Sequence, residues 1–234
     1  MKGKENPRMT SSTLSGVRFI IVVILAVIFC PSEAMVEAKG NSGDDQKKGP
    51  LSRFNDQQLK KLRAGEPVCE YKETSGEGKN SAGYGQSSII INAPIDRCFE
   101  IFSNIENQVH YVPGKKKSKI VGEIDGKLLL DNEYNNYGIT SKYHSIYIID
   151  KKNHRLEWEI DKSRPHDLAE NTGFYQFEKI DEKNTLLTYG ATKIDIGFSV
   201  PNFLKKYLLG RSQTTMAINI RKYIESNGKW RQED

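Results

Sequence analysis

Four histidines are the side chains best suited to proton transfer near neutral pH, because an unperturbed imidazole has a pKa of about 6.5. They are His110, His144, His154 and His166, scattered along the chain. We interpret His154 and His166 as surface residues, since each falls in a predicted turn or loop. His110 and His144 remain candidates for a base that removes a proton from an activated carbon. Neither has a visible carboxylate or arginine partner, so we favour a protein without catalytic activity.

The other motifs of enzymes and metal sites are missing from the sequence. It has no glycine-rich phosphate loop, no GxSxG elbow, no HExxH helix and no clustered metal-ligand spacing. Cys69 and Cys98 lack the CxxC spacing of a redox or metal site. Cys98 falls on the apolar side of a predicted helix, so a buried free thiol and a disulfide with Cys69 both remain open. We therefore expect no metal and no cofactor.

The charge of the chain is mixed and dilute. Lys and Arg total 35 against 30 Asp and Glu, a net charge of +5 over 234 residues. The longest basic cluster, Lys115 to Lys117 with Lys119, is too short to follow a phosphate backbone, and we interpret it as a solvated turn. Nucleic-acid binding is therefore not expected, and the oligomeric state stays open.

The N-terminus carries one apolar run, residues 19–30, between Arg18 and Pro31. It is shorter than the roughly 20 residues that a membrane-spanning helix needs. A basic flank, a short apolar block and nearby small residues are typical of a secretory signal. We expect cleavage after Ala34 or Ala38 and an exported, periplasmic or secreted protein. An anchor formed by residues 17–30 is the alternative.

The chain after this signal divides by composition. Residues 39–53 are polar and glycine-rich and predict a flexible linker. Asn55 is a typical N-cap for a short helix that ends at Gly65, and residues 68–73 suit a strand. The expected organisation is a signal or anchor at 1–38, a linker at 39–53, a helix and strand extension at 54–82, a ligand-binding domain at 83–228 and a tail at 229–234.

Two short helices follow the first strand of the domain. Residues 87–92, with three consecutive isoleucines, predict that strand, and Pro94 suits the first turn of the next helix. Apolar residues then recur at helical spacing through residue 102. A second short helix is expected at 105–111, before Val112, Pro113 and Gly114.

The middle of the chain indicates antiparallel strands, and its end indicates a long helix. In residues 155–161 apolar and charged residues alternate, which is typical of a strand with one buried face. Residues 201–226 return to helical periodicity, with a kink at Gly210 as an option and Gly228 as the stop. The six strands are expected at 119–123, 127–134, 139–149, 155–161, 169–180 and 185–196.

These elements predict an α+β fold in which a curved antiparallel sheet of about seven strands wraps a long C-terminal helix. The chain resembles the helix-grip superfamily in this order of elements and in three stretches of sequence. These are SIIINAPIDRCFEIF at 88–102, IEN at 105–107 and YVPG at 111–114. This superfamily, also called SRPBCC, includes START and Bet v 1-like proteins. The most similar families are the coenzyme Q-binding START domains and the polyketide cyclase/dehydrase-like lipid-transport proteins. The resemblance covers about residues 83–226.

The resemblance implies an apolar cavity between sheet and helix that binds a quinone, lipid, sterol or polyketide. We therefore favour binding or transport of a hydrophobic small molecule, with membrane association during uptake as an option. A cyclase, aromatase or dehydratase using His110 or His144 is the alternative, and a non-catalytic interaction domain with a filled core is another. By position, the expected ligand-binding residues are Phe99, Tyr111, Val112, Tyr134, Tyr143, Trp158, Phe174, Phe203, Tyr207, Met216 and Ile220.

Overall fold

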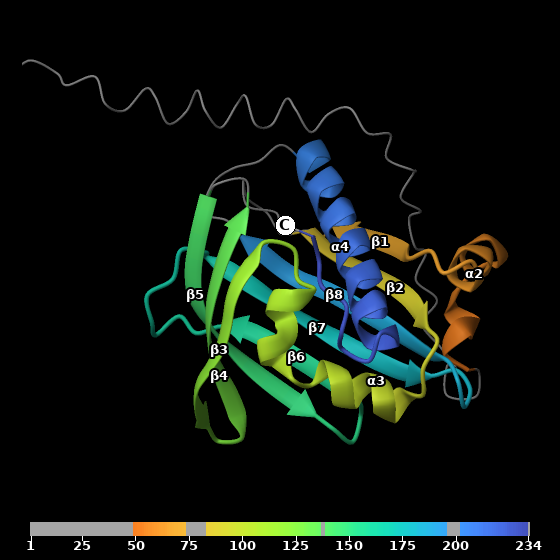
Figure 1. Ribbon diagram of the computed structural model, residues 1–234. Coiled ribbons are helices and arrows are strands. Elements are labelled where there is room, and N and C mark those ends of the chain that lie inside the picture. The colour runs from red at the N-terminus through yellow and green to blue at the C-terminus, as the bar shows by residue number, and fades with distance from the viewer. Residues whose placement is uncertain (1–48, 74–82, 137–138, 196–201, 234) are drawn as a thin grey trace, which may run out of the picture. The chain divides into compact units, whose positions relative to one another are not determined.

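The computed structural model contains one antiparallel sheet of eight strands (Figure 1). It describes residues 49–73, 83–136, 139–195 and 202–233, without the side chains at 71–73, 83–84, 136, 139, 193–195 and 202–211. The strand order is β1-β2-β8-β7-β6-β5-β4-β3. The strands are β1 (Val68–Glu73), β2 (Gly83–Ile91), β3 (Lys115–Ile124), β4 (Lys127–Asn136), β5 (Ile139–Asp150), β6 (Arg155–Ile160), β7 (Glu170–Lys179) and β8 (Thr185–Asp195).

Helices lie on both faces of this sheet. Figure 1 shows α3, the short η3 helix and α4 on the same face, and α2 at the side of β1 and β2. The predicted α+β helix-grip fold with a long C-terminal helix is confirmed. The helices are η2 (Pro50–Arg53), α2 (Asp56–Arg63), α3 (Ile95–Phe102), η3 (Ile105–His110) and α4 (Asn202–Glu225).

The start of the described chain is more ordered than its composition indicated. Pro50–Arg53 forms a 3-10 helix where a flexible linker was expected. Arg53 donates from Nη1 to Glu178 Oε1 over 2.9 Å and from Nη2 to Thr188 Oγ1 over 3.0 Å. These contacts hold η2 against the sheet, so the linker prediction is wrong for residues 50–53.

Local signals in the sequence explain the next elements. The Asn55 side chain accepts from the backbone N–H of Gln58, and the Gln58 side chain accepts from that of Asn55, which forms a capping box. The predicted N-cap is therefore confirmed. Strand β1 pairs with β2 along its whole length, which makes it part of the same sheet and not a separate extension.

Strand β3 begins earlier than the sequence indicated. Gly114 has a φ of +73°, a left-handed conformation that glycine adopts without steric cost, and β3 follows directly. The pairing register with β4 shifts between Lys115 and Lys117, as in a β-bulge. Lys115 is 2% exposed. The interpretation of Lys115 as part of a solvated turn is therefore wrong.

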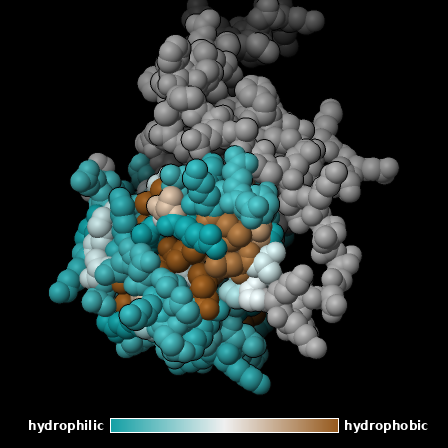
Figure 2. Space-filling view, turned by 90° about the vertical axis from the view of Figure 1, so that its right-hand side faces the viewer, coloured by the Kyte–Doolittle hydropathy of each residue, from teal (hydrophilic) through white to brown (hydrophobic). Residues whose placement is uncertain are grey.

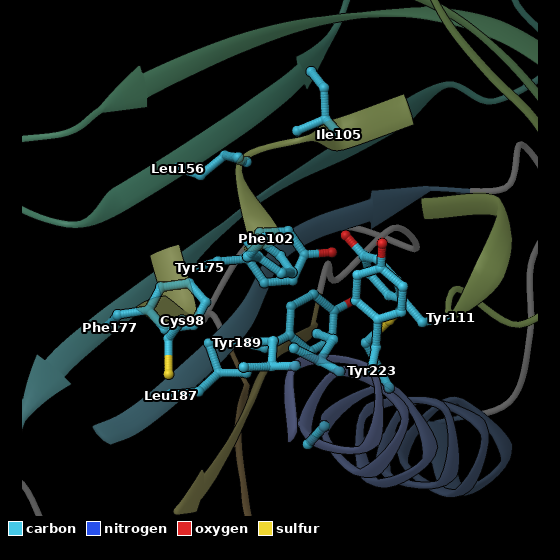
Figure 3. Close-up of a cluster of buried hydrophobic side chains, with 14 of the residues drawn as sticks. Cys98, Phe102, Ile105, Tyr111, Leu156, Tyr175, Phe177, Leu187, Tyr189 and Tyr223 are labelled. Atoms are coloured by element: carbon cyan, nitrogen blue, oxygen red, sulfur yellow. The ribbon is translucent and has the colours of Figure 1, made fainter. Parts of the chain in front are cut away.

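The two faces of the sheet bury two separate cores. The inner core lies between the sheet, α3, η3 and α4, and Figure 3 shows part of it. The outer core lies under η2 and α2 and consists of Phe54, Leu62, Val68 and Leu186. Figure 2, viewed from the α2 side, shows apolar surface framed by hydrophilic residues. The inner core contains Ile89, Ile91, Cys98, Phe99, Phe102, Ile105, Tyr111, Val112, Leu130, Tyr147, Leu156, Trp158, Tyr175, Phe177, Leu187, Tyr189, Met216, Ala217, Ile220, Tyr223 and Ile224.

The C-terminal residues after α4 also contact the domain. The Gln232 backbone N–H donates to the His110 carbonyl over 2.9 Å, and Gln232 Nε2 donates to the Val112 carbonyl over 2.8 Å. Trp230 packs against the inner core. The segment expected as a tail therefore fixes the loop after η3. Among the described residues, no helix has the length and apolarity needed to cross a membrane.

Candidate functional site

Tyrosines dominate the interior beneath the sheet. The rings of Tyr175 and Tyr189 are stacked with centroids 5.0 Å apart, and Trp158 lies 4.9 Å from Tyr175. Figure 3 shows Tyr175, Tyr189 and Tyr111 between the strands and α4. The interior thus presents flat aromatic walls that carry hydroxyl groups. The tyrosine cluster comprises Tyr111, Tyr134, Tyr143, Tyr147, Tyr175 and Tyr189.

All six hydroxyls remain protonated at neutral pH. Burial raises the pKa of Tyr189 to about 12, and burial raises the pKa of Tyr111 and Tyr175 well above their usual value. Neighbouring tyrosines add to the effect, since the pKa of Tyr134 rises through burial first and through Tyr143 next. The cluster therefore offers neutral hydroxyls that both donate and accept hydrogen bonds.

A buried lysine lies beside this cluster. The Nζ of Lys115 donates to Gln108 Oε1 and lies 5.2 Å from the centre of the Tyr134 ring. The Tyr147 hydroxyl donates to the same Gln108 oxygen over 3.2 Å. Burial lowers the pKa of Lys115 to about 7, because an ammonium away from water is costly. We call these four residues the lysine site.

Several polar atoms in the same interior lack a hydrogen-bond partner among the residues that the structure describes. They include the Gln108 Nε2 and the Tyr111 hydroxyl, whose residues are 1% and 0% exposed. Gln213 on α4 has neither amide atom paired. Buried polar groups in folded proteins are nearly always paired, so unpaired ones mark a place where another molecule or water binds.

Other polar side chains in the interior are paired across strands. Asn132 Nδ2 donates to Ser145 Oγ over 3.0 Å. Asn171 accepts from Trp158 Nε1 over 3.1 Å and donates to the Tyr143 hydroxyl over 2.8 Å. These bonds fix the orientation of Trp158 and Tyr143, so the aromatic walls are rigid.

Side-chain bonds from α4 and β3 position η3 and the loop that carries Tyr111. The Asn219 Nδ2 on α4 donates to the Tyr111 carbonyl over 3.0 Å. Ser118 on β3 donates to the Ile105 carbonyl over 2.9 Å, which ties the strand to η3. Gln108 and Lys115 therefore lie at the ends of two segments that are held together by side-chain bonds.

The structure brings most of the predicted ligand-binding residues together. Tyr134 packs against the inner core, and its ring is stacked on Tyr143 with centroids 5.7 Å apart. Phe203 and Tyr207 belong to α4, but their side chains lie outside the described residues. The predicted residues that are members of the inner core are Phe99, Tyr111, Val112, Trp158, Met216 and Ile220.

Phe174 does not join this group. On β7 the buried residues are Gly173, Tyr175 and Phe177, and Phe174 alternates with them. Its ring lies 4.4 Å from the Arg155 guanidinium, on the outer face of the sheet. The prediction that Phe174 points inward is therefore wrong. The inward positions are its neighbours, because consecutive residues of a strand point to opposite faces.

The histidines do not form a base site inside. On β5, His144 alternates with the buried Tyr143 and Ser145, and its Nδ1 has no partner among the described residues. His110 lies beside Tyr223, with ring centroids 6.4 Å apart, and burial and the nearby Arg231 lower its pKa.

The other two histidines differ in exposure. The His166 ring contacts the Arg164 carbonyl over 2.7 Å in an exposed loop, as expected. His154 is half-buried, because its ring contacts Phe99 edge to face and its Nε2 lies 3.0 Å from Asp96 Oδ1. The surface interpretation therefore holds for both residues, since His154 lies in a turn with its side chain 24% exposed and His166 lies in an exposed loop.

Two clefts are described, and both lie on the surface. One, of about 260 Å³, is lined by polar residues of α3 and the end of α4, including Arg97 and Asn227. The other, of about 280 Å³, lies on the outer face of β5, β6 and β7 around Phe174. Neither lies between the sheet and α4, so the interior cavity stays a prediction.

The described cysteines are free thiols. Cys98 is fully buried, and burial raises its pKa to about 11. Cys69 Sγ lies 3.0 Å from Thr214 Oγ1. No group of three or more potential metal ligands occurs in the part of the chain that the structure describes.

Sequence reasoning missed the lysine site. Lys115 and Ser118 are the buried residues of β3, and they are three positions apart. The bulge near Lys115 breaks the two-residue period that marks inward-facing residues in a regular strand. The only local signal was Gly114, which turns the chain into the strand. Gln108 lies in η3, and nothing in the sequence of the short helix predicted there indicated that this glutamine is buried.

No family model matches the sequence, and no curated protein matches it. Solved structures do match. Human StAR-related lipid transfer protein 5 superimposes with a TM-score of 0.54 at 10% identity, over 73% of this chain and 91% of that chain. The Zhui aromatase/cyclase from Streptomyces sp. R1128 gives a TM-score of 0.53 at 13% identity, over 61% and 93%.

A bacterial structure gives a similar result. The STAR-related lipid transfer protein from Xanthomonas axonopodis, fragment 25–204, matches with a TM-score of 0.52 at 12% identity, over 67% of this chain and 93% of that chain. At such identities the likeness establishes the fold. The chain therefore has the helix-grip fold.

Proposed function

We propose that this protein binds and carries a hydrophobic small molecule that bears a polar group. The observation that carries the proposal is the pair of buried, unpaired donors, Gln108 Nε2 and the Tyr111 hydroxyl, beside aromatic walls. Each buried polar atom without a partner lowers the stability of the fold by about 1–3 kcal/mol, so such atoms do not help to stabilise a core. A ligand with a polar group supplies the missing partner.

The aromatic walls support the apolar part of the proposal. Tyr147, Trp158, Tyr175 and Tyr189 present contiguous ring faces, and ligand sites for apolar molecules are lined mainly by such side chains. Proteins of this fold that carry lipid-transfer or aromatase/cyclase names agree with a hydrophobic ligand. Quinones, lipids and polyketide-like molecules are the candidate classes.

Carriage fits better than a cyclase that uses a histidine base. Such a base must lie within hydrogen-bonding reach of the bound substrate. His144 is on the outer side of β5, and His110 lies next to Tyr223 and Arg231. The described interior instead offers neutral hydroxyls and one lysine.

Native mass spectrometry of the gently purified full chain tests the proposal. The protein is mixed at micromolar concentration with a ubiquinone, a fatty acid, a fatty alcohol, a phospholipid and a sterol in turn. We expect a one-to-one complex with at least one of them. A protein that arrives without ligand and takes up none of the five contradicts carriage.

Export is a separate proposal. The secretory signal, the cleavage points at Ala34 and Ala38, and the alternative anchor at 17–30 all fall outside the described residues. The sequence pattern alone supports export. N-terminal sequencing of protein from its native cell tests it, and a retained Met1 on membrane-bound material replaces export with anchoring.

A further inference from the structure

Lys115 is a buried basic group without an acidic partner among the residues that the structure describes. Its contacts with the side-chain Oε1 of Gln108 and with the face of the Tyr134 ring both favour a positive ammonium. Neither contact carries a negative charge that balances it. A buried ammonium without a counter-charge is costly, so an anionic group bound here would stabilise the charged form of Lys115.

The groups around Lys115 have the properties of an anion-binding set. Gln108 Nε2 and the Tyr111 hydroxyl are buried donors without partners. The Tyr111 hydroxyl interacts electrostatically with that of Tyr147, which is bound to the same Gln108. Lys115 of β3 contacts Gln108 of η3 directly, and Tyr111 belongs to the loop that joins these two elements, so the three donors come from one short stretch of chain. A carboxylate has two oxygens and accepts several such bonds.

We propose that Lys115, Gln108 and Tyr111 bind the carboxylate head of an otherwise apolar ligand. This inference rests on the proposed function and narrows its ligand class to hydrophobic carboxylic acids. A single negative charge matches the single lysine, whereas a phosphate with its charge of about −1.5 to −2 leaves part of that charge buried and unbalanced. The apolar chain of the acid packs along the rings of Tyr147, Trp158 and Tyr175.

The titration of Lys115 agrees with this role. Burial lowers its pKa to about 7, and a carboxylate partner favours the charged form. The groups that face it are Gln108 from η3, Tyr134 from β4 and Tyr147 from β5. Burial raises the pKa of both tyrosines, so they stay neutral. Binding of an acid at pH 8 is therefore expected to take up a proton at Lys115.

Titration calorimetry of the full, delipidated chain with dodecanoic acid and 1-dodecanol tests the proposal. The two probes share chain length and differ in the head group. We expect the wild-type protein to prefer the acid by about tenfold or more, since hydrogen bonds to a charged group are among the stronger ones. Lys115→Met should abolish the preference and leave alcohol binding in place. Lys117→Met, an exposed neighbour paired with Asp131, is the control and should keep it.

A second variant covers the case in which Lys115→Met does not fold. Gln108→Glu keeps the side-chain size and gives Lys115 an internal carboxylate, so acid binding should fall by about tenfold while the alcohol still binds. Equal affinity of the wild-type protein for acid and alcohol overturns the inference and leaves carriage intact. No binding of either probe to the wild-type protein overturns the proposed function itself.

Discussion

The outer and inner cores lie on opposite faces of one sheet and differ in how completely their buried polar groups are hydrogen-bonded. The outer core is formed by Phe54, Leu62, Val68 and Leu186, and the buried Ser88 and Thr188 on the same face of the sheet bond each other over 3.1 Å. Polar groups at its edge are paired, as in the bonds of Arg53 to Glu178 and Thr188.

The inner core contains the tyrosine cluster, the lysine site and unpaired amide and hydroxyl atoms. Apolar burial with paired edges is the pattern of a stabilising core, because it leaves no desolvated polar atom without a partner. The inner core departs from that pattern at Gln108 Nε2 and the Tyr111 hydroxyl, which are buried and have no partner among the described residues. On the proposed function, this difference gives the outer core a stabilising role and part of the inner core a role in ligand binding.

The largest expected effect is a loss of stability in the outer core. Leu62 is 1% exposed, and Leu62→Ala should lower the free energy of unfolding by about 2 to 5 kcal/mol through lost burial and a cavity. Urea unfolding measures it, with Leu59→Ala on the same helix as a milder, partly buried control. Ligand affinity per folded molecule should stay the same, and a tenfold change in affinity contradicts the division between the cores.

The second effect is a pH dependence that comes from Lys115. Its folded pKa of about 7 is below the unfolded value of 10.5, so the unfolded chain binds more protons between these values. Stability of the ligand-free protein should therefore rise from pH 7 to pH 9, by about 2 kcal/mol. Urea unfolding at both pH values measures it.

Lys115→Met is the control for this pH dependence and should remove the rise. The window ends at the unfolded pKa of Cys98, 9.0, above which its raised folded pKa makes stability fall. The same rise in wild type and variant means that Lys115 is not its source.

A smaller effect separates paired from unpaired tyrosine hydroxyls. Tyr143→Phe removes a hydroxyl that is bonded to Asn171 and should cost about 0.5 to 1.5 kcal/mol of stability. Tyr111→Phe removes an unpaired one and should leave stability unchanged or slightly raised, while ligand affinity falls. Thermal unfolding and calorimetry on both variants measure the contrast. A larger loss of stability for Tyr111→Phe than for Tyr143→Phe reverses the expected order.

The smallest effect concerns the ion pair at the edge of the outer core. The side chains of Arg53 and Glu178 are 39% and 29% exposed, so water and salt weaken their attraction. Arg53→Ala should cost less than about 1 kcal/mol, and the cost should shrink in high salt. Urea unfolding at low and high salt checks this. A salt-independent cost indicates that the packing of Arg53 on Phe54, and not its charge, is what matters.

The sequence was sufficient for the order of elements and for much of the inner core. Helical spacing placed Cys98, Phe99 and Phe102 on one buried face, and alternation placed Trp158 inward, as the structure confirms. Such periodicity works where an element is regular, because burial then repeats at a fixed interval.

The lysine site was beyond sequence reasoning for a physical reason. The bulge in β3 breaks the interval that would mark Lys115 as buried, and the Tyr134 ring that Lys115 contacts lies on another strand. Lysine also carries a strong expectation of exposure, which only the tertiary structure overrides. The prediction for Phe174 was wrong for a similar reason. In β7, charged and apolar residues do not alternate, so the sequence does not show which residues face inward.

Fluorescence quenching of Trp158 by a bromine-labelled dodecanoic acid tests the central claim most directly. The sequence has 2 tryptophans, so Trp230→Phe leaves Trp158 as the only emitter, and Trp158 lies in the inner core. If the interior binds a hydrophobic molecule, quenching should saturate at one ligand per chain and reverse on adding unlabelled dodecanoic acid. Bound ligand that leaves the Trp158 emission unchanged contradicts binding in the inner core.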